Sequence, residues 1–142
     1  MMYEIFRTKE NGVTAERNLP NPTPAELEIL RVLWRIGPAT VRDVQDAIPA
    51  ARRSGYTTVL KLLQIMTEKG LVAREPQGRA HLYRAIPSES QAQRQIVGDM
   101  LDRVFGGAAE QLVMHALTAR KASPEELAEI RKLLDRLEGD DR

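Results

Sequence analysis

The sequence contains no cysteine, which excludes disulfide bonds, thiol nucleophiles and metal sites built on thiolates. Aromatic residues make up only 4% of the 142 residues, so the core must be mainly aliphatic. No apolar run approaches the roughly 20 residues that span a bilayer. The first 20 residues lack the apolar segment of a signal peptide. We therefore expect a soluble, cytoplasmic protein.

Patterns typical of catalytic or metal sites are also missing. The two histidines, His81 and His115, lie in different segments, and neither has an acidic residue beside it at metal-binding spacing. The chain has no glycine-rich phosphate loop, nucleophile elbow or HExxH motif. We expect no enzymatic activity, no cofactor, no metal and no small-molecule substrate. His81 is interpreted as a packed or solvent-facing residue, with contact to DNA as the alternative, and His115 as helix surface or dimer packing.

The formal net charge of +1 conceals an uneven distribution. Residues 50–84 contain seven basic and two acidic residues, a net charge of +5, which leaves −4 for the rest of the chain. A positive block inside a nearly neutral chain suggests an anionic partner such as nucleic acid. A solvated, arginine-rich surface would give the same count. The seven bases are Arg52, Arg53, Lys61, Lys69, Arg74, Arg79 and Arg84.

Hydrophobic periodicity predicts three helices before residue 70. In "TPAELEILRVLW", Thr23 and Glu26 have the spacing of a capping box. Thr40 opens a second helix, and residues 56–69 form a third that Gly70 ends. The capping residues thus mark where the first two helices begin, and Gly70 marks where the third helix ends.

After Gly70 the period changes to two. "LVARE" and "AHLYRAI" predict strands joined by the turn "PQGR", with Arg79 at a basic tip. Leu82 lies between His81 and Tyr83, so we expect an apolar-leaning face with Leu82 and a polar face with its neighbours. A mainly α fold follows, with a winged helix-turn-helix domain in residues 21–87 whose third helix would read DNA.

The helical period returns at Ser88 and predicts three more helices in residues 88–142. Their apolar stripes are wider than three isolated helices can hide, so we expect a helical dimerisation domain and a homodimer. Residues 1–20 are polar without a clear period, and we expect a flexible N-terminal extension. The candidate dimerisation residues are Leu101, Leu112, Leu127, Ile130, Leu134 and Leu137.

The helix at residues 56–69 has an apolar side and a polar side with few ions. Base edges in the major groove offer donors, acceptors and thymine methyls, which short hydroxyls, amides and a few cations can match. Residues 57 and 58 lie in the first turn, where they would hold a phosphate or simply cap the helix. Leu60 is interpreted as packing under the wing, whereas Ile65 would either pack there or touch a thymine methyl. The candidate DNA-binding residues are Arg52, Arg53, Thr57, Thr58, Lys61, Gln64 and Arg79.

Several segments together resemble the penicillinase-repressor family of winged-helix regulators, the BlaI/MecI/CopY type. They are "TPAELEILRVLW", "VRDVQDAI", "YTTVLKLLQIMTEKGLV" and "GRAHLYRAI", within about residues 22–137. The resemblance implies a dimeric repressor whose winged helix binds a pseudo-palindromic operator and whose C-terminal helices pair two copies. It assigns the DNA-reading positions to Thr57, Thr58, Lys61 and Gln64.

Three departures bear on what the resemblance implies. Ile65 stands where such helices frequently carry arginine, so the operator sequence does not carry over. The cysteine-rich tail of the copper-responsive branch is absent, which excludes a thiolate metal switch. Repressors of the β-lactam-responsive branch are inactivated by cleavage of an Asn-Phe bond in the dimer region. The similar stretch of this chain, "EQLVMHALTA", has His115-Ala116 at the position of that bond. Relief of repression by proteolysis, through a membrane-bound sensor metalloprotease, and relief by another signal therefore both stay open.

The sequence thus predicts a dimeric, sequence-specific transcriptional repressor with residues 57–68 in the major groove. The alternative is a winged-helix adaptor that binds protein and not DNA, because fold alone does not decide function. The basic balance of residues 50–84 favours DNA. Salt dependence separates the two hypotheses, since binding to several phosphates weakens steeply as salt rises.

Overall fold

The computed structural model describes residues 19–140. The predicted N-terminal extension therefore lies outside the described residues, apart from Leu19 and Pro20. Contacts within the chain divide it into two compact units, one up to Gly98 and one from Asp99 onward. Helix α6 (Glu89–Arg103) contributes residues to both. Among residues 19–140, none of the helices has the length and apolar character that crossing a membrane requires.

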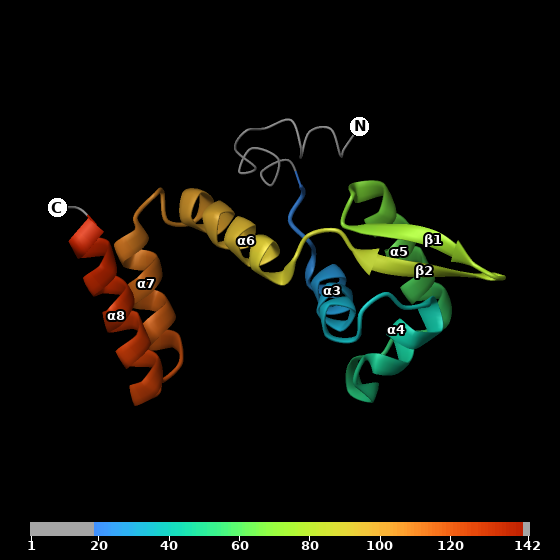
Figure 1. Cartoon of the computed structure of the whole chain (residues 1–142), viewed down its shortest axis with the longest axis horizontal. Helices are drawn as coiled ribbons and strands as arrows, with labels where there is room; N and C mark the ends of the chain where they lie inside the picture. Colours follow the sequence, from blue (N-terminus) through green and yellow to red (C-terminus); the bar gives the residue numbers. More distant parts are fainter. Residues whose placement is uncertain (1–18, 141–142) are drawn as a thin grey trace. The chain divides into compact units, whose positions relative to one another are not determined.

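Three helices of the first unit follow the predicted order: α3 (Pro24–Ile36), α4 (Val41–Ala47) and α5 (Tyr56–Lys69) (Figure 1). Thr23 Oγ1 accepts from Glu26 N at 3.2 Å and Glu26 Oε1 accepts from Thr23 N at 3.0 Å, so the capping box of α3 is confirmed. Thr40 and Asp43 form the same motif at α4. Helix α5 ends at Gly70, whose φ of 84° is left-handed. A short 3₁₀-helix, η1 (Ala50–Arg52), was not predicted.

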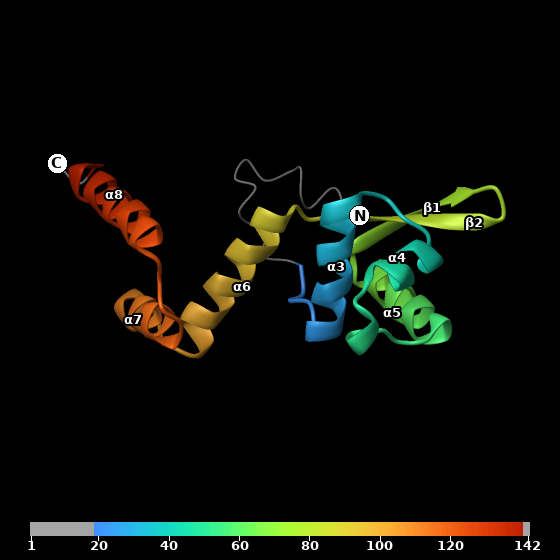
Figure 2. The same cartoon turned by 90° about the horizontal axis from the view of Figure 1, so that it is seen from below.

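The predicted wing is an antiparallel hairpin of β1 (Val72–Gln77) and β2 (Ala80–Ala85). Its turn end projects beyond the helices (Figure 1 and Figure 2). Tyr83 N donates to Ala39 O at 2.8 Å and Ala39 N donates to Tyr83 O at 3.0 Å, which ties the hairpin to the segment before α4. The expected polar face was wrong at Tyr83, which is 2% exposed while Leu82 is only half-buried. The pleat of β2 places the ring of Tyr83 on the side of the hairpin that packs against the core.

The core of the first unit lies between the three helices and the base of the hairpin. It is almost wholly aliphatic, as the composition predicts, and each large side chain buried contributes roughly 1.5–3 kcal/mol. Helix α5 supplies three of its members, so the predicted apolar side of that helix is the buried one. The buried cluster comprises Ile29, Leu30, Val32, Leu33, Ala39, Val41, Val44, Ile48, Val59, Leu63, Met66, Leu71, Val72 and Tyr83.

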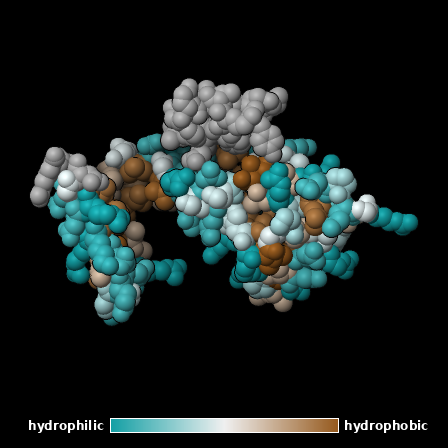
Figure 3. All heavy atoms as spheres, in the orientation of Figure 1, coloured by the Kyte–Doolittle hydropathy of each residue, from teal (hydrophilic) through white to brown (hydrophobic). Residues whose placement is uncertain are grey.

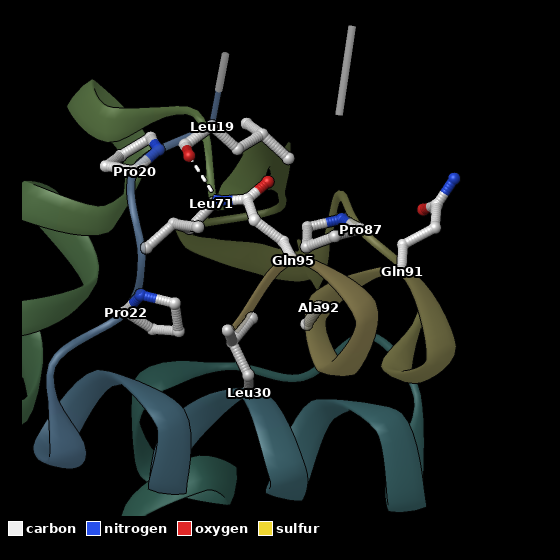
Figure 4. Close-up of a pocket in the computed structure, with 9 residues that line it drawn as sticks. All are labelled: Leu19, Pro20, Pro22, Leu30, Leu71, Pro87, Gln91, Ala92 and Gln95. Carbon is white, nitrogen blue, oxygen red and sulfur yellow. Dashed lines mark hydrogen bonds between the residues drawn. The ribbon is translucent and has the colours of Figure 1, made fainter. Parts of the chain in front are cut away.

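The first turns of α6 are fastened to this unit. Gln95 Nε2 donates to Leu19 O and, at 3.1 Å, to Asn21 Oδ1. Trp34 Nε1 of α3 donates to Pro87 O at 3.0 Å. Figure 4 shows the small, mostly apolar pocket that the N-terminal segment, α3 and α6 enclose. Its lining residues are Leu19, Pro20, Pro22, Leu30, Leu71, Pro87, Gln91, Ala92 and Gln95.

The second unit contains the end of α6, α7 (Ala109–Ala119) and α8 (Pro124–Asp140). Gly106 and Gly107, both with positive φ, follow α6, and a capping box between Ser123 and Glu126 opens α8. Of the described residues from Asp99 onward, none is buried. Figure 3 shows hydrophobic atoms at the surface of this unit. The large apolar residues exposed here are Met100, Val104, Val113, Met114, Leu133, Leu134 and Leu137.

Candidate nucleic-acid interface

The polar side of α5 is the exposed side. Val59, Leu63 and Met66 are at most 1% exposed and hold the helix against the core. Half-buried Leu60 packs against that core, as predicted, and Ile65 is also half-buried. The helix therefore presents hydroxyl, amide and ammonium groups outward. The predicted reading residues on this side, all exposed, are Thr57, Thr58, Lys61 and Gln64.

The N-terminus of α5 has features that suit an anion. Its cap residue is Gly55, which has no side chain to satisfy the first backbone N–H groups. Thr57 and Thr58 lie inside the first turn of the helix and not at its cap. The interpretation of either threonine as an ordinary cap was therefore wrong. Unpaired N–H groups at the start of a 14-residue helix, beside two hydroxyls, can receive a phosphate oxygen.

The two arginines before α5 are engaged within the protein. Arg52 Nε lies 2.7 Å from Glu28 Oε2 of α3, with 62% of the arginine side chain exposed. Arg53 donates from Nε and Nη2 to Ile48 O at 3.1 and 2.9 Å, and from Nη2 to Asp46 O at 3.0 Å. Arg53 thus satisfies carbonyl oxygens at the C-terminal end of α4. Neither contact follows from the sequence pattern.

The positive block of residues 50–84 does not form one surface. Lys69 is directed inward to the buried carboxylate of Glu26. Arg84 is exposed on β2, paired with Ala73, whereas Arg79 is exposed in the turn of the hairpin. Of the bases of the block, Lys61, Arg74, Arg79 and Arg84 are exposed on α5 and the hairpin, and Arg84 lies on the face of β2 opposite to Tyr83. The positive charge available to a ligand is therefore smaller than the seven basic residues of the block suggest.

A groove between α4, α5 and the hairpin brings further residues together. Gln64 and Arg79, both predicted, border it. Thr57, Thr58 and Lys61 are outside its lining. Sequence reasoning missed Arg42, because it precedes the basic block, and Arg74, whose side depends on its pairing with the buried Tyr83. It also missed Tyr56, which belongs to the groove only through the packing of α4 and the hairpin beside α5. The full lining comprises Thr40, Val41, Arg42, Tyr56, Leu60, Gln64, Arg74, Arg79, Ala80, His81 and Tyr83.

The remaining candidates lie elsewhere. Within residues 19–140, no group of three or more His, Cys, Asp or Glu side chains is arranged to hold a metal ion. His115 is exposed on α7, with its ring centroid 5.8 Å from that of Phe105, and Ala116 beside it is also exposed. Of the predicted dimerisation residues, Leu134 and Leu137 are 54% and 52% exposed. The half-buried ones are Leu101, Leu112, Leu127 and Ile130.

Comparison with known proteins gives consistent matches. A model of the penicillinase repressor family matches residues 22–136. The transcriptional regulator BlaI of Mycobacterium tuberculosis is 31% identical over 114 residues, which cover 80% of this chain and 82% of that protein. The penicillinase repressor of Bacillus licheniformis is 23% identical over 119 residues, covering 84% and 93%. The solved structure of the transcriptional regulator Tm0710 from Thermotoga maritima aligns with a TM-score of 0.45 and 18% identity, covering 82% and 74%.

Proposed function

The chain belongs to the penicillinase repressor family of DNA-binding transcriptional regulators, and we propose that it represses transcription as a dimer on a pseudo-palindromic operator. Each copy would insert the Thr57–Glu68 part of α5 into a major groove. The observation that carries this proposal is the outward polar side of α5, which is backed by the core and has few ions. Two such helices would meet half-sites about one helical turn apart, or a multiple of it.

The side chains on α5 suit different parts of the duplex. Gln64 can accept from and donate to adenine, and Lys61 can donate to the acceptors of guanine. The hydroxyls of Thr57 and Thr58, with the first backbone N–H groups of the helix, suit a phosphate. Helix α5 would therefore read bases with its middle and fix its position with its first turn.

The arginines contribute unequally to the proposed contact. Arg79, in the exposed turn of the wing, would reach the flanking backbone. Arg52 would exchange Glu28 for a phosphate, because its guanidinium is already largely exposed. Arg53 is bonded to the carbonyls of α4, so its contribution would come mainly through the local positive potential.

The second unit supports the proposal of a homodimer. An apolar surface such as that of α6–α8 is characteristic of a protein interface, and a second copy would cover it. Repression would be relieved by a signal, and by family resemblance a membrane-bound sensor metalloprotease is one source of it. His115-Ala116 lies within α7, so cleavage there would require local opening of this helix. We further propose that the protein acts in the cytoplasm by binding alone, without catalysis or a cofactor.

Selection of bound fragments from the organism's own genome tests the function directly. The recovered fragments should share a pseudo-palindrome, and the logarithm of affinity should fall linearly with the logarithm of salt concentration by about 0.9 per phosphate contacted. A winged-helix adaptor that binds only protein would recover no shared sequence.

A further inference from the structure

The groove between the first turn of α4, one side of α5 and the hairpin is strongly basic. Arg42, Arg74 and Arg79 line it together with Gln64 and His81. Of the described residues in its lining, none is an aspartate or a glutamate. An anionic ligand would therefore meet only positive or neutral groups along its walls.

The pleat of the hairpin determines which wing residues face this groove. Arg74 pairs with Tyr83 in the strand register, and paired residues project from the same side of a sheet. Tyr83 is buried against the helices, so Arg74 projects from the inner side. Glu75 is one residue later and projects from the outer side. The alternation thus keeps the carboxylate of β1 out of the groove.

Arg42 reaches the groove from α4 and is held by an aromatic ring. Its guanidinium carbon lies 5.6 Å from the centroid of the Tyr56 ring, at the first residue of α5. A cation–π contact of this kind restrains the guanidinium and leaves its N–H groups able to donate. The neighbouring carboxylate of Asp43 accepts from Thr40 N at 3.3 Å in the capping box of α4. Arg42 is therefore oriented without being neutralised by that residue.

We propose that Arg42 binds a phosphate of the operator, and that the groove carries the backbone of one DNA strand between α5 and the wing. This inference rests on the proposed function. When the polar side of α5 faces the bases, the sugar-phosphate backbone of a strand that borders the major groove runs alongside the helix. A guanidinium can grip a phosphate through two parallel hydrogen bonds. Tyr56 acts through Arg42 and is a positioning residue.

The test is the salt dependence of binding to a labelled operator fragment obtained by genomic selection, followed by fluorescence anisotropy. Arg42→Ala should weaken binding about tenfold on operator and scrambled DNA alike. It should also reduce the magnitude of the salt slope by about 0.9, since one phosphate contact is lost. Arg31→Ala is the matched control, because Arg31 is exposed on α3 and does not line the groove. This control should leave the slope unchanged.

Variants of Tyr56 separate positioning from a merely structural role. Tyr56→Phe keeps the aromatic face and should bind as the unmodified chain does. Tyr56→Leu should weaken binding about threefold in the chain that retains Arg42. It should have no effect in the variant that already carries Arg42→Ala, because the two residues act through one contact. Circular dichroism of each variant shows whether the fold is retained.

The results distinguish this inference from the proposed function. A steep salt slope in the unmodified chain that is unchanged in Arg42→Ala would overturn the role of Arg42 and leave the repressor proposal standing. Additive effects of the Arg42 and Tyr56 substitutions would overturn the positioning role of Tyr56. If the unmodified chain binds no DNA, both proposals are wrong.

Discussion

Lys69, the last residue of α5, places its Nζ 2.8 Å from Oε2 and 3.0 Å from Oε1 of Glu26 in the first turn of α3. The carboxylate is 2% exposed and also accepts from the backbone N of Thr23. One buried side chain therefore closes the cap of α3 and fastens the C-terminal end of the helix that we propose reads DNA. The orientation of α5 depends on this contact as well as on its apolar side.

Removing the two partners of this ion pair should have unequal effects. Lys69→Met leaves a buried carboxylate without its counter-ion, so we expect the free energy of unfolding to fall by about 3 kcal/mol. Glu26→Gln keeps an acceptor for Thr23, and the ammonium, 32% exposed, can still reach water, so we expect a loss of about 1 kcal/mol. Urea unfolding measures both.

The exposed pair of Lys132 and Glu129 provides the control for that comparison. Its side chains are 69% and 72% exposed, and Lys132→Met should change stability by less than about 0.5 kcal/mol. Equal losses for Lys69→Met and Glu26→Gln would show that burial of the carboxylate does not dominate the energetics of the pair.

Lys61→Ala should weaken binding to the operator by roughly 1–3 kcal/mol if the ammonium contacts a base. If it contacts a phosphate, the loss should be similar on operator and scrambled DNA. A gel-shift series with both fragments distinguishes these outcomes. Lys121→Ala removes the same charge from an exposed position between α7 and α8 and should change neither affinity. Unchanged binding by Lys61→Ala would remove this residue from the proposed interface.

Leu134→Asp should convert dimers into monomers, because it places a charge within the exposed apolar stripe of α8. Sedimentation velocity at several protein concentrations measures the change. Ala128→Asp adds the same charge to the same helix, on the face opposite to the leucine stripe, and should leave the dimer intact. A Leu134→Asp protein that remains dimeric would place the interface elsewhere.

Gly98→Ala should raise the free energy of unfolding by about 0.5–1 kcal/mol, since Gly98 lies inside α6 and glycine weakens helix interiors. A Cβ atom added there meets nothing within 4 Å. Gly37→Ala is the contrasting variant, because Gly37 has a φ of 86° that an alanine adopts only with strain. We expect this variant to be destabilised. Chemical denaturation that finds Gly98→Ala less stable than the unmodified chain would contradict the prediction.

Local signals in the sequence predicted most of the fold because they depend on residues close together in the chain. The capping pair of Thr23 and Glu26 and the stop at Gly70 give helix boundaries that the structure confirms. The apolar spacing of Val59, Leu63 and Met66 likewise identified the buried side of α5 and, with it, the exposed polar side. A helical period of 3.6 residues is sufficient for both inferences.

The partners of charged and aromatic side chains were decided only by the tertiary structure. Glu26 and Lys69 are far apart in the sequence, and so are Arg52 and Glu28, yet each pair is in contact. Arg42 joins the groove from outside the basic block, and Tyr83 turns inward against the expected polarity of its strand. Sequence spacing gives the face that a residue occupies on its own helix or strand. Which other element covers that face depends on packing between distant segments, which no local pattern encodes.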